Sequence, residues 1–444
     1  MTDDIDRSAL RQFLLGLAQG MNASAESVDR IRDTVTEVAH AYGGDDTDFV
    51  VLPTIILVET GESDEARVAI RSATNASFRF DQIAALYELI AQARTGSVAP
   101  LDGIRRLNEI GAMRPRLGWI TRTLGHAVLT TGLALLLAPT WQGAIVAFVL
   151  GAGIGLLKLV RSPTLQLVLP IAAAFVCAAA VFVLAEVIEI GDPLRLLIAP
   201  LVTFLPGGVL TTATVELAAG QMMSGASRLV YGLVQLSLLA FGILAAGTVV
   251  GVESHSYEPL AAPSTLPWWV ALLGILVFAL GNYLHFSAPG STFGWVLLAL
   301  VVAYAGQWAG TELLGATVGG FVGAVAMSIV VFWIGSLRHG TPVQITFLPA
   351  FWLLVPGAAG LVGLTEAVAT DGGLGDFITA LVSVMSIALG VLIGTALYRV
   401  VHHGAEEIVQ FAVAAPTVAA GGVRRHPWDR LLPSRRGGSG ARSR

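Results

Sequence analysis

The stretch from Ala199 to Arg228 combines residue types that could bind a polar solute inside an otherwise apolar helix. Pro206-Gly207-Gly208 interrupts this stretch near its middle. Proline has no N–H group, and its ring displaces the carbonyl of the preceding helical turn. Irregular backbone and ionisable groups at membrane depth are tolerated where they line a cavity or lie buried in protein, so the stretch predicts a functional site. The polar groups that follow the break belong to Thr211, Thr212, Thr214 and Glu216.

A break in a membrane helix exposes the first N–H groups of the helix that follows it. These groups lack intrahelical partners and carry the positive end of the helix dipole, so they can receive a carboxylate. Gly208, Thr212, Glu216 and Gly220 recur every fourth residue and are predicted to share one helical face. A hydroxyl and a carboxylate on this face suit a small zwitterion with a polar side chain, and Glu216 could bind its ammonium group or a proton.

Two structural alternatives stand beside this interpretation. Each threonine hydroxyl could bond to the carbonyl four residues earlier in its own helix. Glu216 could serve only to pair with a basic residue such as Arg228.

A second copy of the motif occurs later in the chain. Pro356-Gly357 is followed by Glu366 at the same ten-residue distance that separates Pro206 from Glu216. Both motifs fall on the fourth span of a five-span half, and an odd number of spans places the second half in the opposite orientation. The sequence therefore predicts an inverted repeat with interrupted helices, an architecture of secondary transporters.

The composition indicates a helical membrane protein. The chain has 444 residues, of which 55% are hydrophobic and 13% charged, with a mean hydropathy of +0.73. The net charge of −5 carries little information because the charges are segregated. The single cysteine excludes an intrachain disulfide. We find no metal-binding cluster, cofactor motif or phosphate loop, so transport would depend on an ion gradient or on the gradient of the substrate itself.

Residues 1–118 hold about half of the basic residues and predict a small cytoplasmic α+β domain. We expect helices at about 8–20, 25–42, 80–95 and 100–112. A strand is predicted over 49–59, paired with another over 67–71. No signal-peptide core follows the acidic N-terminus, which places this domain on the cytoplasmic side.

Ten spans are predicted after this domain, in two repeats of five that cover 119–252 and 253–400. The first five lie at about 120–138, 141–158, 164–187, 195–217 and 228–251. The second five lie at about 268–286, 291–310, 313–335, 344–368 and 376–398. Residues 401–444 form a basic tail that we expect to be disordered.

The charge distribution predicts that both termini are cytoplasmic. With ten spans, every Lys and Arg except Arg195 falls on the cytoplasmic side. This distribution agrees with the positive-inside rule. Two polar residues near the inner end of the sixth span, Asn282 and His285, could form a proton relay or interhelical hydrogen bonds.

The motif from Pro206 to Arg228, PGGVLTTATVELAAGQMMSGASR, resembles the signature of the threonine/serine exporter family. The N-terminal FLLGLAQGMNASAESVDRIRDTVTEVAHAYG, the following FVVLPTIILVE and the later LVPGAAGL are similar to that family as well, so the resemblance covers about residues 10–400. It implies a ten-span inner-membrane carrier that exports threonine and serine, driven by the membrane potential or proton gradient. Split relatives in this family are linked to export of dicarboxylates such as succinate.

We therefore predict a secondary exporter of small hydroxy amino acids, not an enzyme, with protons as the favoured coupling ion and sodium as the alternative. Its partners would be the amino-acid substrate and the lipid bilayer, and we expect no nucleic-acid partner. The sequence is compatible with a homo-oligomer but does not fix the oligomeric state. Alternative functions are dicarboxylate export, a channel or receptor with a cytoplasmic sensory domain, and an intramembrane protease. The few basic residues in the spans argue mildly against a dicarboxylate.

Overall fold

The computed structural model describes most of the chain. The described residues are 7–60, 67–72, 77–137, 140–160, 162–252, 257, 266–354, 356–369 and 373–403. Met1–Tyr398 form one compact unit, and Arg399–Arg444 are assigned to a second. The predicted disordered tail lies almost wholly outside the described residues.

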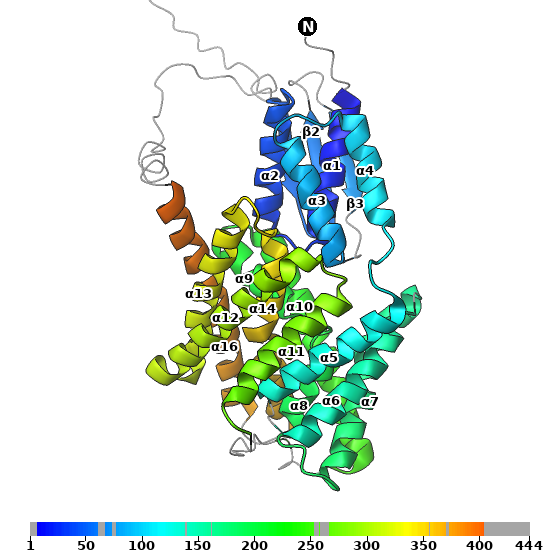
Figure 1. Cartoon of the computed structure of the whole chain (residues 1–444), viewed down its shortest axis with the longest axis vertical. Coiled ribbons are helices and arrows are strands. Elements are labelled where there is room, and N and C mark those ends of the chain that lie inside the picture. The colour runs from blue at the N-terminus through cyan, green and yellow to red at the C-terminus, as the bar shows by residue number, and fades with distance from the viewer. Residues whose placement is uncertain are drawn as a thin grey trace, which may run out of the picture. The chain divides into compact units, whose positions relative to one another are not determined.

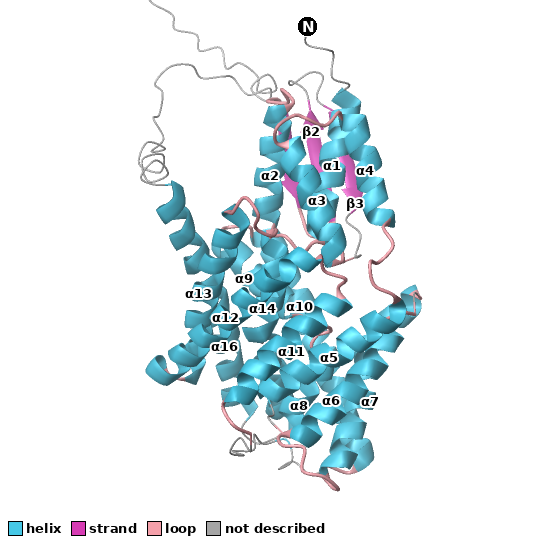
Figure 2. Ribbon diagram, viewed as in Figure 1, coloured by secondary structure: helices cyan, strands magenta, loops and turns pink. Residues whose placement is uncertain are grey.

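The N-terminal module, residues 7–116, contains four helices and an antiparallel sheet in the order β1-β2-β3. Figure 2 shows that the strands are confined to this module, and Figure 1 shows its helices beside them. The helices are α1 (Arg7–Ala23), α2 (Val28–Ala41), α3 (Phe80–Ala93) and α4 (Pro100–Ala112). The strands are β1 (Thr47–Val51), β2 (Ile55–Thr60) and β3 (Arg67–Ser72).

The single strand predicted over 49–59 is wrong, because the structure divides it into β1 and β2. Pro53 has no N–H for a sheet ladder, and the chain turns there, with the Leu52 N–H donating to the Ile55 carbonyl at 2.8 Å. The predicted pairing with the strand at 67–71 is confirmed, since Leu57 of β2 faces Ile70 of β3.

The N-terminal module has a hydrophobic core of its own. Apolar side chains from α1, α2 and α3 pack onto β1 and β2, whereas β3 is largely exposed. The fully buried members include Phe13, Leu14, Leu17, Ile31, Val35, Ile56, Val58 and Leu86. Phe80 and Ile83 of α3 belong instead to the core of the apolar helices, and the module forms one compact unit with these helices.

The apolar helices follow from Trp119 onward. Those of the first half are α5 (Trp119–Leu137), α6 (Trp141–Leu157), α7 (Pro163–Ala185), α8 (Pro193–Leu201), α9 (Gly207–Ala218) and α10 (Met222–Val250). Those of the second half are α11 (Trp269–His285), α12 (Phe293–Leu314), α13 (Ala316–Ser336), α14 (Val343–Leu354), α15 (Pro356–Ala369) and α16 (Gly373–His403), with the short 3-10 helix η2 (Gly290–Thr292) before α12.

Six of the described helical segments are long and apolar enough to cross a bilayer, and α6, α11 and α14 are shorter apolar helices. The chain is thus a multi-pass helical membrane protein. Helices lie at each of the ten predicted positions, but the fourth and the ninth positions each hold two helices, and the ninth consists of α14 and α15. The span predicted over 195–217 consists of α8 and α9, which are separated by the non-helical residues 202–206.

The first helices of the two halves, α5 and α11, pack against each other in antiparallel directions. A Cβ atom added at Gly132 would lie 2.3 Å from the Phe278 backbone nitrogen, and one added at Gly281 would lie 2.1 Å from that of Leu129. Gly125 lies in the same way against His285. Residue numbers therefore increase along α5 while those of the contacting residues in α11 decrease, so the two helices run in opposite directions. Backbone contact at this distance requires residues without side chains.

Helix pairings recur between the two halves. The pairs α5–α6, α6–α8, α7–α8 and α7–α10 correspond in order to α11–α12, α12–α14, α13–α14 and α13–α16, and all eight pairs are in contact. One corresponding pair is closely packed through a glycine in each half. Gly242 of α10 lies against the Ile171 carbonyl of α7, and Gly390 of α16 lies against the Phe321 carbonyl of α13. These four pairings of the first half thus have counterparts in the second.

Candidate functional site

The chain breaks at the predicted place between α8 and α9. Pro206 occupies the N-cap position of α9 with φ −81° and ψ 27°, and no side chain caps this helix end. Gly207 is buried at the first helical position. A Cβ atom added at Gly208 would meet no other atom within 4 Å, so open space adjoins the first turn. The break is therefore a true interruption that leaves an uncapped helix start beside open space.

The three threonines of α9 have different surroundings. Thr211 is 3% exposed, and its hydroxyl has no hydrogen-bond partner among the described residues. Thr214 donates to the Leu210 carbonyl at 3.0 Å within its own helix, as the structural alternative predicted. Thr212 is half-buried. Among the described residues, the hydroxyls of Thr211 and Thr212 form no hydrogen bond within the protein, and that of Thr211 is buried.

Glu216 lies at the other end of α9 and is fully buried. Its Oε2 atom lies 3.1 Å from Nε of Arg228, and its Oε1 accepts the Val28 N–H at 3.1 Å. Val28 is the first residue of α2, so the carboxylate faces the positive end of that helix. The structure therefore pairs Glu216 with Arg228 and connects the N-terminal module to the apolar helices.

Neighbouring residues strengthen this connection. Gln221 donates to Asp29 at 2.7 Å, and the Arg30 guanidinium lies over the Phe332 ring, 5.1 Å from its centroid. Glu26 positions Arg30 through an ion pair of 3.6 Å and accepts a hydrogen bond from the Tyr87 hydroxyl. Burial and the adjacent carboxylate raise the pKa of Tyr87 well above its ordinary value, so this hydroxyl stays protonated.

The later residues of the motif position the Glu216–Arg228 pair. Gly220 has φ +82° and lies beyond the end of α9, so it does not share the helical face predicted for it. A Cβ atom added at Gly225 would lie 2.7 Å from the Ala213 carbonyl, so glycine permits the close packing of α10 on α9. The turn and this packing bring Arg228 back to Glu216.

The predicted site residues therefore fall into two groups along α9. At about 1.5 Å of rise per residue, Glu216 lies roughly 13 Å from the start of the helix at Gly207. Pro206, Gly207, Gly208 and Thr211 surround the break, whereas Glu216 and Arg228 lie where the helix meets α2. One small solute cannot contact both the start of α9 at Gly207 and Glu216 in this conformation.

The second copy of the motif contacts the first. α15 packs against α8 and α9, and α14 also contacts α9. Glu366 is 6% exposed, so it is buried rather than solvated. Pro356 and Gly357 begin α15, but their side chains and Val355 lie outside the described residues.

Asn282 and His285 do not bond to each other. The Asn282 amide donates to the Phe278 carbonyl of its own helix at 2.8 Å. His285 Nδ1 lies 3.0 Å from the Arg122 carbonyl of α5, and the His285 ring lies edge-on to that of His126, with centroids 4.8 Å apart. Of the two predicted alternatives, His285 forms the interhelical hydrogen bond, with the Arg122 carbonyl. Asn282 and His285 do not form a relay with each other.

Sequence reasoning missed a basic cavity near the break. The cavity has a volume of about 170 Å³, and Arg79, Arg122, Lys158 and His285 are among its lining residues. These residues come from four distant parts of the sequence, and no spacing connects them. The available signal was the absence of any acidic residue between Glu109 and Glu186, which leaves the basic residues there without local partners.

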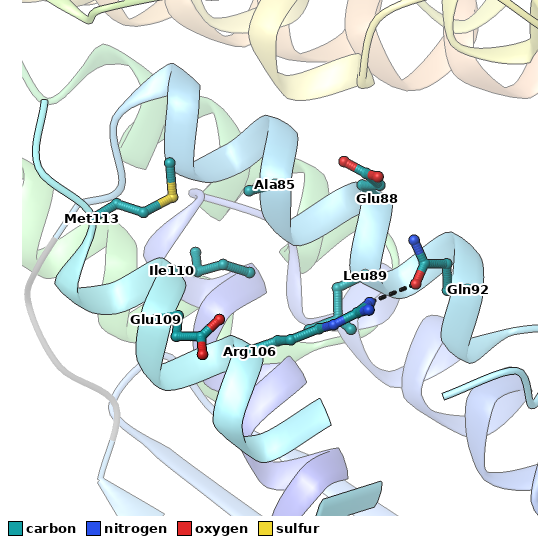
Figure 3. A pocket seen from close by; sticks show the side chains of 8 residues that line it. All are labelled: Ala85, Glu88, Leu89, Gln92, Arg106, Glu109, Ile110 and Met113. Carbon is teal, nitrogen blue, oxygen red and sulfur yellow. Dashed lines mark hydrogen bonds between the residues drawn. The ribbon is translucent and has the colours of Figure 1, made fainter. Parts of the chain in front are cut away.

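A second, open groove lies between α3 and α4 of the N-terminal module. Arg106 extends across it and donates to Gln92 at 2.6 Å, and Glu88 and Glu109 lie at its edges (Figure 3). Arg106, Glu88 and Glu109 are all exposed. Water solvates these charges, so we assign no ligand to the groove.

An uncapped helix break among apolar helices, where α9 contacts α15, is typical of a membrane transporter. Comparison with known proteins agrees: the family model ThrE, described as "Putative threonine/serine exporter", matches residues 12–250. The chain belongs to this family. It is also 26% identical to the "Probable threonine/serine exporter" of Mycobacterium tuberculosis (strain ATCC 25618 / H37Rv), over 91% of this chain and 79% of the relative. No solved structure matches the chain.

Proposed function

We propose that the protein exports threonine and serine across the inner membrane, with the substrate carboxylate at the start of α9. The observation that carries this proposal is the uncapped first turn after Pro206, next to the open space at Gly208 and the buried Thr211 hydroxyl. The free N–H groups suit a carboxylate, and the Thr211 hydroxyl suits the hydroxyl of the substrate.

The arrangement of the two halves supports a carrier rather than a channel or receptor. The equivalent helix pairings and the antiparallel α5–α11 contact are those expected of an inverted repeat. In such carriers one half rocks against the other around a central site. We propose that the ten helical positions form two inverted five-span repeats, with the N-terminal module and both termini cytoplasmic and protons as the coupling ion.

Glu216 has a separate part in this proposal. It holds the cytoplasmic end of α9 through Arg228 and the start of α2, so opening of this contact would free α9 to move. Once released from Arg228, the carboxylate could take up a proton, which would link transport to the proton gradient. We place Glu366, buried in the neighbouring α15, as its counterpart in the second half.

Dicarboxylate export is the second candidate, because the structure brings Arg122 and Lys158 to one cavity near the break. Cells that carry the protein should be loaded with labelled threonine, serine or succinate, and efflux should be measured with and without an uncoupler. We expect faster efflux of threonine and serine. Succinate efflux alone would replace the amino-acid proposal with the dicarboxylate one.

We expect Thr211→Val to reduce threonine efflux several-fold while leaving the protein as stable as the wild type or more so. In the described structure the Thr211 hydroxyl is buried without a partner, so its removal costs no hydrogen bond within the protein. Only a ligand would lose the roughly 1 kcal/mol that such a bond contributes. Efflux of labelled threonine and the thermal unfolding midpoint Tm of the purified protein measure the two effects.

Thr214→Val is the matched control, because the Thr214 hydroxyl donates to a carbonyl of its own helix. We expect this variant to leave efflux unchanged. Gly208→Leu gives a steric test at the same site: its Cβ atom would meet no neighbour within 4 Å, and we expect the added side chain to exclude the substrate. Normal efflux in both Thr211→Val and Gly208→Leu would contradict a binding site at the start of α9.

A further inference from the structure

The basic cavity lies where the N-terminal module meets the first apolar helices. Arg79 immediately precedes α3, Arg122 lies in the first turn of α5, and Lys158 is the C-cap residue of α6. His285 ends α11. All four line one cavity of about 170 Å³, which is large enough for a small anion or the charged group of a larger one.

Three of the residues that line the cavity are cationic, namely Arg79, Arg122 and Lys158. No carboxylate is among its described lining residues. Arg79 forms an ion pair of 3.1 Å with Asp81. The structure gives Lys158 no carboxylate within ion-pair distance among the described residues; its ammonium instead lies 5.4 Å from the centre of the Phe204 ring. Like charges grouped in a partly enclosed space favour a bound anion.

Donor geometry in the cavity also suits an oxyanion. Arginine offers a planar fork that matches two oxygens of a carboxylate or phosphate, and lysine adds a compact charge with three donors. Arg79 is fixed by a hydrogen bond of 2.9 Å to the Met113 carbonyl. Arg122 is held by a bond of 3.4 Å from its Nε to the His285 carbonyl. These cations are therefore positioned before any ligand arrives.

The cavity is connected to the broken helix by two contacts. Lys158 lies over Phe204, and His126, which neighbours His285, lies 3.1 Å from the Thr203 hydroxyl. Thr203 and Phe204 belong to the non-helical link between α8 and α9. An anion that draws Lys158 toward the cavity would loosen one of the contacts that hold this link.

We propose that this cavity is an oxyanion-binding site, in which Lys158, Arg122 and Arg79 bind a carboxylate or phosphate group from the cytoplasmic side. The oxyanion can come from a soluble anion or from the headgroup of an anionic lipid, because the cavity lies at the predicted cytoplasmic membrane surface. The site does not depend on which solute the protein exports.

The test uses the full-length protein in phosphatidylcholine nanodiscs. Inorganic phosphate is titrated against the unfolding midpoint Tm at constant ionic strength, with chloride as the balancing anion. We expect a saturable rise in Tm for the wild type. Lys158→Gln should weaken the apparent phosphate affinity about tenfold, as for one lost charge-assisted hydrogen bond. Lys158→Arg, which keeps the charge, should retain most of the response.

Arg106→Gln removes the same charge from the exposed groove between α3 and α4, and is expected to respond to phosphate as the wild type does. A second arm adds phosphatidylglycerol to the nanodiscs. If this lipid raises Tm and suppresses the phosphate response in the wild type but not in Lys158→Gln, the lipid headgroup is the oxyanion. The proposal is overturned if neither phosphate nor lipid raises Tm, or if Lys158→Gln responds to both like the wild type.

Discussion

Arg228→Met is expected to destabilise the protein by about 3–5 kcal/mol, because it leaves a buried carboxylate without its cationic partner. The Arg228 side chain is 15% exposed and that of Glu216 is fully buried, so water cannot replace the lost partner. Among the described residues, the Val28 N–H would be the one remaining hydrogen-bond donor to the Glu216 carboxylate. The measurements are the Tm and the yield of monodisperse protein after extraction in detergent.

Glu216→Gln is expected to abolish or uncouple threonine efflux while leaving membrane insertion intact. The glutamine amide can still accept the Val28 N–H, but it can neither balance Arg228 nor take up a proton. The double variant Glu216→Gln/Arg228→Met removes both charges, and we expect it to regain much of the stability lost in Arg228→Met. Its efflux should remain absent if the carboxylate itself acts in transport.

The double variant thus separates two roles of Glu216. If efflux returns together with stability, the carboxylate has only a structural role and its part in the proposed mechanism is wrong. Arg195→Met is the matched control. Arg195 pairs with Asp192 at 3.4 Å but is 52% exposed, so its loss should cost at most about 1 kcal/mol.

Gly281→Leu is expected to prevent the two halves from assembling. Even a Cβ atom at this position would lie 2.1 Å from the Leu129 nitrogen and 2.3 Å from its Cα. These atoms are backbone, so α5 and α11 would have to separate rather than adjust a rotamer. The cost should exceed the roughly 1–3 kcal/mol of ordinary overpacking. We expect little monodisperse protein and a strongly lowered Tm in what remains.

Gly153→Ala is the control for this variant, because a Cβ atom at Gly153 of α6 meets nothing within 4 Å. Alanine should there be neutral or slightly stabilising, since it favours a helix more than glycine does. If Gly281→Leu folded as well as Gly153→Ala, the antiparallel contact between α5 and α11 would be wrong.

Much of the secondary structure could be predicted from local patterns. Long apolar runs predicted helices at the ten positions, and Pro206 with its glycines predicted the interruption between α8 and α9. Prediction failed at Pro53, where an apolar, β-branched run looked continuous although proline lacks the N–H of a sheet ladder. Ala199–Arg228 could be recognised as important because its break, hydroxyls and carboxylate are close together in the sequence.

The partners of these side chains could not be predicted in the same way. Glu216 looked like a ligand for a solute, yet it meets the N–H of Val28, a residue 188 positions earlier. The basic cavity likewise combines residues from the N-terminal module with residues from α5, α6 and α11. No periodicity in the sequence relates such positions, because long-range packing sets their distances.

By itself, the sequence determined the class of protein, the position of the helix break and the family, since these depend on hydropathy, proline and a contiguous motif. The tertiary structure alone decided that the two ends of α9 differ. One end is an uncapped helix start with the unpartnered Thr211 hydroxyl, and the other is held by Arg228 and α2. The physical reason is that a buried charge or hydroxyl is defined by its neighbours, and folding brings these neighbours from elsewhere in the chain.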